Sequence, residues 1–408
     1  MLSPPPIEYW RSATGADLLK RAQELAEATN FDGATLALRI KSAAKSVGVT
    51  ELNGVIDLVL ARHKATARLG KWCQEAFLTC RSVEQASRPE IAGYRAQGFA
   101  SSRHVLEIGT GAGFDTAHIA HVAHRVTTLE PDARLAEMAR FNLALQGIEN
   151  VEVRVSTAED FLVSNDLNPF DGLYADPSRR DSTGARIRAA EDYLPPVGLI
   201  VAAPIKGVVG IKASPALDIA LPEGWGRQFI GFAGECLEQT LWSGRPAPLP
   251  AVFLADTATP WFDTGACPAL LAADELPSGY LLDPHPALVR AHAVGSFYAE
   301  HGLREIDPRS PYGLSSEPCM TPFGQPFRII ESFPFRLRDL KSRLEALRWT
   351  NRTEIKKRGV EEDPDQLRLK LKLPRQAHPT DPFGVVILAR RGESILAILA
   401  ERLRSGEE

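Results

Sequence analysis

Residues 1–95 carry apolar side chains at helical spacing. Two stretches, 16–26 and 55–62, show apolar stripes at positions i, i+3, i+4 and i+7, which predict amphipathic helices. Neither stretch shows the alternation of apolar and polar residues that a half-buried strand requires. We therefore expect a helical N-terminal domain over residues 1–95.

The pattern changes after residue 103, where short apolar runs alternate with helical stretches. The apolar runs predict strands at 104–108, 125–130, 151–155, 170–175, 207–212, 227–233 and 251–255. Helices are predicted at 115–122 and 132–146, with Gly147 placed for a left-handed C-cap. Strand–helix–strand repetition is typical of a parallel sheet covered on both faces. Residues 96–265 are thus expected to form a doubly wound α/β domain.

The last third of the chain is less regular. Residues 266–325 are rich in Pro, Gly and Ser with one helical stretch at 286–301, which indicates either a linker or a small α+β unit. Residues 326–408 form the last predicted domain. Within it the apolar run 383–389 predicts a buried strand, and we expect a helix at 394–404.

Composition narrows the class of protein without naming a function. The chain has 408 residues, 44% of them hydrophobic, and a net charge of -4, so it has the composition of a soluble globular protein. Its first residues lack a signal-peptide pattern, and the apolar stretch 199–205 is far shorter than a membrane helix. The five cysteines lack metal-ligand spacing. We expect a cytoplasmic protein without a metal site or a membrane partner.

A glycine-rich loop, Gly109-Thr110-Gly111-Ala112-Gly113, joins a predicted strand to a predicted helix. A dinucleotide-binding loop needs a further glycine where Phe114 stands, and the G-K-[ST] of a phosphate-binding P-loop is absent. S-adenosylmethionine (SAM) carries no phosphate and needs mixed polar partners, which the E-x-G-x-G-x-G pattern from Glu107 supplies. SAM is the favoured cofactor; a nicotinamide or flavin, or a loop that serves only as a tight turn, remain alternatives.

Position along the predicted sheet suggests a role for each cofactor residue. Glu107 would accept hydrogen bonds from the SAM ammonium, and Glu130, after the second strand, would bind the ribose hydroxyls or else be a solvated strand-end acid. Ala158 and Glu159 follow the third strand, where the adenine is expected, although Thr157 stands where an acid is common. The full predicted cofactor set is Glu107, Gly109, Thr110, Gly111, Gly113, Asp115, Glu130, Ala158 and Glu159.

The loop Asp176-Pro177-Ser178-Arg179-Arg180 follows the fourth predicted strand, where the methyl acceptor would lie. It is similar to the D/N-P-P-aromatic loop of methyltransferases that act on base nitrogens, with Ser178 and Arg179 replacing the second proline and the aromatic. A guanidinium can stack on a base or hold a phosphate, so a nucleotide acceptor still fits. Asp176, Pro177, Ser178 and Arg179 are the predicted catalytic residues; a turn with exposed arginines is the alternative.

Carbon methylation would need a thiolate in addition to this loop. Cys236 is the cysteine late in the α/β domain, and we interpret it as a small buried residue rather than a nucleophile.

Several segments together resemble bacterial class I SAM-dependent methyltransferases with a THUMP-like C-terminal domain. These segments are 82–87, 109–115, 141–142, 176–180, 212–218, 351–359 and 367–373. The resemblance implies a helical N-terminal domain, a Rossmann-like methyltransferase domain and a C-terminal α/β module related to RNA-binding THUMP domains. Ser178 and Arg179 depart from the base-amine pattern, so the substrate is left open.

Charge in the C-terminal domain bears on the substrate. Residues 328–375 contain 14 Lys/Arg against 8 Asp/Glu, and the basic segment 348–375 could contact phosphates or form a solvated face. Trp349 could stack on a base but is better interpreted as core. Our hypothesis is therefore a SAM-dependent methyltransferase that acts on RNA. The alternatives are a small-molecule or protein methyltransferase, or a non-catalytic RNA-binding protein that keeps the fold.

Overall fold

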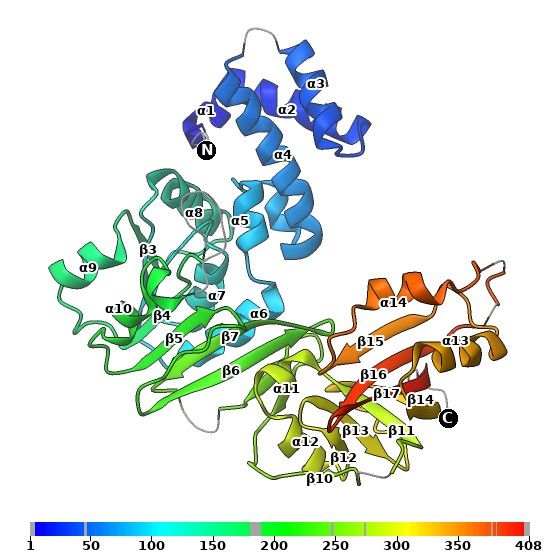
Figure 1. Cartoon of the computed structure of the whole chain (residues 1–408). Coiled ribbons are helices and arrows are strands. Elements are labelled where there is room, and N and C mark those ends of the chain that lie inside the picture. Colours follow the sequence, from blue (N-terminus) through cyan, green and yellow to red (C-terminus); the bar gives the residue numbers. More distant parts are fainter. Residues whose placement is uncertain are drawn as a thin grey trace. The chain divides into compact units, whose positions relative to one another are not determined.

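The computed structural model describes residues 5–44, 47–179, 189–245, 249–272, 275–376, 378–380 and 382–403 (Figure 1). Arg180 of the predicted acceptor loop lies outside these residues. The chain divides into two compact units, the first made of residues 1–226 and 239–247 and the second of residues 227–238 and 248–408. Across the described ranges, every helix is too short or too polar to cross a membrane.

The first unit begins with helices, as the apolar stripes predicted. They are α1 (Ile7–Arg11), α2 (Ala13–Ala28), α3 (Gly33–Ala43), α4 (Val49–Leu69), α5 (Cys80–Gln85) and α6 (Pro89–Ala96). The Ser12 side chain accepts from the Gly15 backbone N–H and so caps α2. Leu36, Val55 and Val59 pack in one buried cluster that also includes Met138 of the following α/β part.

A mostly parallel sheet follows in the same unit. Its elements are β1 (His104–Ile108), α7 (Phe114–Val122), β2 (Arg125–Leu129), α8 (Ala133–Leu145), β3 (Val151–Arg154), α9 (Ala158–Ser164), β4 (Gly172–Ala175), α10 (Val197–Val201), β5 (Val208–Ala213) and β7 (Glu235–Ser243). The strand order is β3-β2-β1-β4-β5-β7, and only β7, through its residues 239–243, runs antiparallel to its neighbour. The predicted strands and helices of this region are confirmed within a few residues. Gly147 adopts the expected positive φ of +71°.

The order of strands creates a switch point between β1 and β4. The chain runs from β1 outward to β3, then returns to place β4 on the other side of β1. Parallel strands end at the same edge, so the loops after β1 and β4 leave side by side. In an open α/β sheet, this crevice is where ligands bind.

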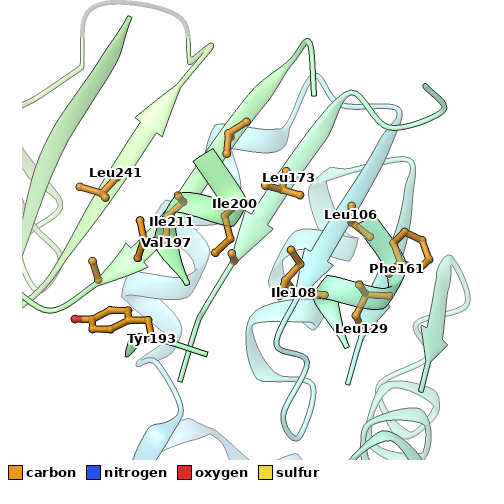
Figure 2. Packing of buried hydrophobic residues seen from close by; sticks show 14 of the residues in the cluster. Leu106, Ile108, Leu129, Phe161, Leu173, Tyr193, Val197, Ile200, Ile211 and Leu241 are labelled. Atoms are coloured by element: carbon orange, nitrogen blue, oxygen red, sulfur yellow. The ribbon is translucent and has the colours of Figure 1, made fainter. Parts of the chain in front are cut away.

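The two faces of the sheet bury different side chains. Leu106, Leu173 and Ile211 face a hydrophobic core that α9 and α10 cover (Figure 2). Because successive strand residues point to opposite faces, the neighbouring Glu107 and Lys212 point to the other face.

The second unit has its own mixed sheet, ordered β10-β12-β13-β11-β14-β17-β16-β15. Its elements are β10 (Ala269–Leu270), β11 (Tyr280–Pro284), α11 (Pro286–Arg290), α12 (Val294–Glu300), β12 (Arg304–Asp307), β13 (Ser310–Ser315), β14 (Gly324–Pro334), α13 (Leu337–Ala346), β15 (Glu354–Arg358), α14 (Pro364–Leu371), β16 (Val385–Arg391) and β17 (Ser394–Arg402). The unit also contains most of β6 (Trp225–Phe232), together with β8 (Val252–Leu254) and β9 (Thr259–Trp261).

Of two helix predictions in this unit, one was wrong and the other is confirmed in part. The expected helix at 394–404 is instead β17, which pairs with β14 on one side and β16 on the other. Gly392, at a φ of +56°, lies in the two-residue turn that joins β16 to β17. The single helix expected at 286–301 is divided into α11 and α12, with His292 at a φ of +54° between them.

Candidate functional site

The glycine loop lies at the switch point and is held from two sides. Gly109 has a φ of +95°, and a Cβ placed on it would lie 2.8 Å from the carbonyl oxygen of Asp176. The Asp176 backbone N–H in turn donates to the Ile108 carbonyl oxygen at 3.0 Å. Only glycine satisfies both the positive φ and this close approach. The β1 and β4 loops are therefore in direct backbone contact.

The far side of the loop is open. Gly111 has a φ of +55°, and a Cβ there would meet no heavy atom of the described residues within 4 Å. The buried Asn142 side chain donates to the Ala112 carbonyl oxygen at 3.0 Å and bonds the Phe77 backbone. Gly113, at a φ of +88°, is the N-cap of α7. The Asn142 side chain thus anchors the loop through Ala112, while the backbone at Gly111 faces the open crevice.

Glu107 is fully buried on β1. Neither of its carboxylate oxygens has a hydrogen-bond partner among the described residues. Burial raises the pKa of this carboxyl to about 8, with a smaller opposing effect from the hydroxyls of Thr116 and Thr128. A buried carboxyl without a partner costs folding free energy, and a cationic ligand would remove that cost.

Glu130 binds the glycine loop itself. Its carboxylate accepts from the Gly111 N–H at 2.9 Å and from the Asp132 N–H at 3.0 Å. Its side chain is buried, and burial raises its pKa. The interpretation of Glu130 as a solvated acid is therefore wrong. Each carboxylate oxygen can accept two hydrogen bonds, which leaves capacity for ligand hydroxyls. Nearby, the hydroxyls of Thr110 and Thr128 lie 2.5 Å apart.

The acceptor loop after β4 is anchored to a later segment. Ser178 and Leu194 exchange two backbone hydrogen bonds, at 2.8 and 3.1 Å. Pro177 is buried, whereas Asp176, Ser178 and Arg179 are half-buried. The loop therefore presents a carboxylate, a hydroxyl and a guanidinium at the same sheet edge as the glycine loop.

A buried ionic network lies on the sheet face opposite the core of Figure 2; it consists of Arg95, Asp115, Tyr174, Lys212 and Asp176. Arg95 and the Tyr174 hydroxyl donate to Asp115 Oδ2 at 2.7 and 2.8 Å. Lys212 Nζ lies 3.9 Å from that oxygen and donates to Asp176 Oδ2 at 2.7 Å. Burial alone would raise the pKa of Asp115, but the charges of Arg95 and Lys212 lower it to about 2.

No sequence pattern indicated a role for Arg95, Tyr174 or Lys212. Lys212 carried a signal, because it is a charged residue in the otherwise apolar strand β5, yet its side chain is only 6% exposed. Arg95 carried no such signal, since a lone arginine on a short helix is ordinarily solvated. Asp115 was predicted as a cofactor residue, and the structure directs its Oδ2 into the network.

Other predicted residues lie farther along the sheet edge or are buried. Ala158 belongs to the core, and Glu159 is exposed in the first turn of α9, directly after β3. Burial raises the pKa of Cys236 to about 12, so its thiolate form is disfavoured at neutral pH. Trp349 is buried in the core of the second unit, as expected. Within the described ranges, no cluster of three His, Cys, Asp or Glu could hold a metal ion.

The basic segment of the second unit divides into paired and exposed cations. Lys356 and Arg358 both bind Asp283, at 2.9 and 2.8 Å, and Lys356 Nζ also lies 3.6 Å from Glu354, so both cations are paired within the unit. Arg352 lies over the ring of the exposed Phe383 at 4.4 Å. The exposed cations of the segment are Arg348, Arg352, Lys357, Arg368, Lys370, Lys372 and Arg375.

A relative from Mycobacterium tuberculosis H37Rv, named as an uncharacterized S-adenosylmethionine-dependent methyltransferase, decides the family. It is 30% identical over 351 residues, which cover 82% of this chain and 91% of the relative. The chain belongs to the SAM-dependent methyltransferases. The methyltransferase also matches the family model "THUMP domain-like" over residues 324–402 and the model for protein-L-isoaspartate O-methyltransferase over residues 85–177.

A solved structure supports the fold, and a further relative matches part of the sequence. A solved structure from Porphyromonas gingivalis W83, described as a candidate methyltransferase, has a TM-score of 0.73 at 20% identity and covers 94% of this chain and 99% of its own. A protein-L-isoaspartate O-methyltransferase from Dinoroseobacter shibae is 32% identical over 134 residues, or 32% of this chain and 61% of the relative. The second match covers only a minority of this methyltransferase.

The residues of the site fit SAM on structural grounds. Glu107 offers two buried oxygens without partners, and Gly111 leaves open space beside the loop. The cofactor carries an ammonium and a positively charged sulfonium, so an unpaired buried carboxyl is a suitable complement. The methyltransferase thus has both a cradle of bare backbone and an acid that lacks a partner.

We expect Glu107→Gln to stabilise the free protein and weaken binding of S-adenosylhomocysteine, which carries the same ammonium. The native pKa of about 8 lies above the unfolded value of 4.5. The native state therefore holds the proton more tightly, and wild-type stability falls as pH rises from 4.5 to 8. The glutamine variant lacks this loss, which corresponds to about 4 kcal/mol at pH 8. The affinity of the variant for S-adenosylhomocysteine should fall about 10-fold, because glutamine lacks the negative charge that pairs with the ligand ammonium.

Urea unfolding across this pH range and calorimetry with S-adenosylhomocysteine provide the two measurements. The exposed Glu149 serves as the control, and Glu149→Gln should change neither quantity. Equal pH dependence of stability in wild type and Glu107→Gln would contradict the assignment of Glu107 as a buried acid without a partner.

Proposed function

We propose that this methyltransferase acts on RNA, transferring the methyl group in line to an acceptor held at Asp176-Pro177-Ser178-Arg179. The exposed basic side chains on the THUMP-like module carry the proposal. Exposed Arg and Lys contact phosphates without regard to base sequence, as binding to a structured RNA requires. The match to protein-L-isoaspartate methyltransferases covers only residues 85–177 and does not include the module.

Each residue of the crevice has a proposed part in binding. Glu107 accepts from the SAM ammonium, and Glu130 uses its free lone pairs for the ribose hydroxyls. Ala158 and Glu159 lie after β3, next to β2, where the adenine would follow the ribose. When bound, SAM supplies an electrophilic methyl group. The backbone contact between Gly109 and Asp176 joins the cofactor loop to the acceptor loop, and positioning of this kind is a main source of rate enhancement.

The first experiment separates the substrate classes. Tritiated SAM is incubated with total RNA, with protein extract or with metabolites, and label is expected in RNA. Asp176→Asn should reduce that label at least about 100-fold while leaving S-adenosylhomocysteine binding intact, because the carboxylate orients the acceptor and receives its proton. The exposed Asp160 is the control, and Asp160→Asn should retain activity. Label confined to protein or metabolites would contradict the RNA proposal.

Measurements of RNA binding test the role of the exposed cations on the THUMP-like module. Changing Arg352, Lys370 and Arg375 to glutamine should weaken RNA binding and lower the slope of log affinity against log salt by about 2, the value for three phosphate contacts to single strands. A variant with three exposed cations of α2 and α3 changed, K20Q/R39Q/K41Q, removes the same charge. Equal losses in the two variants would indicate nonspecific attraction rather than a binding module.

A further inference from the structure

We infer that the methyl acceptor is a hydroxyl oxygen, in RNA the ribose 2′-hydroxyl, and that Lys212 and Asp176 bind it together. This inference rests on the proposed RNA substrate and goes beyond it by naming the acceptor atom. Sequence comparison with base-amine methyltransferases pointed to a nucleotide but left the acceptor open. The pairing of a buried lysine with the loop aspartate decides between the possible acceptors.

Neighbouring strand ends bring the two side chains together. The residues before them, Ala175 and Ile211, are register partners on the parallel strands β4 and β5. Lys212 Nζ donates to Asp176 Oδ2 at 2.7 Å. The Lys212 side chain is 6% exposed and that of Asp176 is 26% exposed. The aspartate is therefore the more accessible member of the pair, and the lysine is its buried member.

The network holds the lysine in place from below. Lys212 Nζ also lies 3.9 Å from Asp115 Oδ2, which Arg95 and Tyr174 bind at the same time. Two carboxylates and two cations balance each other in this buried space. A lysine fixed in this way can aim an N–H group, whereas a solvated lysine would lose that orientation to its flexible stem.

An adjacent ammonium and carboxylate complement a group that both donates and accepts hydrogen bonds. A hydroxyl does both: its O–H bonds Asp176, while one oxygen lone pair receives the Lys212 N–H and the other remains for the methyl group. An exocyclic amine presents N–H donors to the ammonium and would be repelled. A ring nitrogen has one in-plane lone pair, which the ammonium would occupy.

The transfer step is balanced with these two residues alone. The hydroxyl oxygen uses its remaining lone pair to form the O–CH3 bond, and the S–CH3 bond breaks with its electron pair left on sulfur. The hydroxyl proton passes to Asp176 and from there to water. Lys212 keeps its protons and stabilises the negative charge that grows on the oxygen as the proton leaves.

Identification of the methylated nucleoside tests the inference with the wild-type enzyme. RNA labelled with tritiated SAM is digested to nucleosides and analysed by mass spectrometry, and we expect a ribose-methylated nucleoside. An RNA with a 2′-deoxynucleotide at the mapped position should accept at least about 100-fold less label. A base-methylated product would overturn this inference but leave the RNA proposal intact, whereas absence of label from RNA would overturn both.

Variants of Lys212 test its part in the reaction. Lys212→Met should lower kcat about 100-fold, the loss typical of one oriented donor. It should leave the affinity for S-adenosylhomocysteine within about 2-fold, because Lys212 faces the acceptor. Lys212→Arg keeps the charge and an N–H donor and should recover at least about 10-fold of the loss.

The exposed Lys206 precedes β5, and Lys206→Met is the matched control. Thermal unfolding of each variant accompanies the kinetics, so that a misfolded Lys212→Met is recognised and the arginine variant carries the test. An unchanged kcat in a folded Lys212→Met variant would overturn the assignment of Lys212. If Lys212→Met misfolds, a Lys212→Arg variant that is no more active than Asp176→Asn would overturn it.

Discussion

Replacement of Gly109 by alanine is expected to destabilise the protein and to reduce kcat/KM about 100-fold, as displacement of a catalytic loop by about 1 Å can. An alanine at a φ of +95° is strained, and its Cβ would approach the Asp176 carbonyl oxygen to 2.8 Å. That oxygen belongs to backbone, so the two loops must separate. Strain and separation together should lower the free energy of unfolding by about 2–4 kcal/mol.

Substitutions at two other glycines distinguish the effect of backbone strain from the effect of separating the two loops. Gly147 also has a positive φ, but a Cβ on it would meet nothing within 4 Å among the described residues, so Gly147→Ala should show strain alone. Gly111→Ala adds a methyl group on the open side of the loop and should weaken S-adenosylhomocysteine binding with a stability cost like that of Gly147→Ala. Calorimetry and urea unfolding measure both quantities. Gly109→Ala with wild-type activity would contradict a shared cofactor and acceptor crevice.

Asp115→Asn is expected to lower the free energy of unfolding by about 3–5 kcal/mol at pH 7, the range for removal of one partner from a buried ion pair. The change leaves Arg95, only 2% exposed, without the carboxylate that it binds. Lys212 loses the same counter-charge. An exposed pair offers the contrast: Asp17 binds Arg21 on α2 with both side chains more than half exposed, and Asp17→Asn should cost less than about 1 kcal/mol.

The pH dependence of this effect has a definite sign. The native pKa of Asp115, about 2, lies below the unfolded value of 3.8. Its stabilising contribution is therefore complete above about pH 4 and is lost as pH falls toward 2. The difference between wild type and Asp115→Asn should shrink over that window. A double variant, Asp115→Asn with Arg95→Met, should be less destabilised than the sum of the single variants. Strict additivity would contradict the network.

Sequence patterns predicted the parts of the site that depend on neighbouring residues. The run from β1 through the glycine loop into α7 combines a buried strand, a turn with positive φ and a helix start, and each has a local signature. The acceptor loop was found in the same way, since Asp176 directly follows an apolar strand. That these two loops meet follows from a general rule of parallel sheets rather than from any particular contact.

Local patterns failed where pairing partners decide the outcome. Residues 394–402 are almost continuously apolar in their middle, and such a run suits a buried helix or a central strand equally well. Hydrogen bonding to β14 and β16 on both sides selects the strand. The charge count of the basic segment likewise overstated its exposed cations, because Asp283, distant in sequence, forms ion pairs with both Lys356 and Arg358.

The sequence by itself determined the order of strands and helices in the methyltransferase sheet, the glycine loop, the acid within β1 and the acid after β2, and the acidic loop after β4. These features arise from backbone preferences and hydrophobic periodicity over a few residues. Only the tertiary structure decided that Lys212 pairs with Asp176 and that Arg95 neutralises Asp115. Such contacts join helix α6, helix α7 and strands β4 and β5, and burial makes them obligatory, because an unpaired charge there would cost more than the fold can supply.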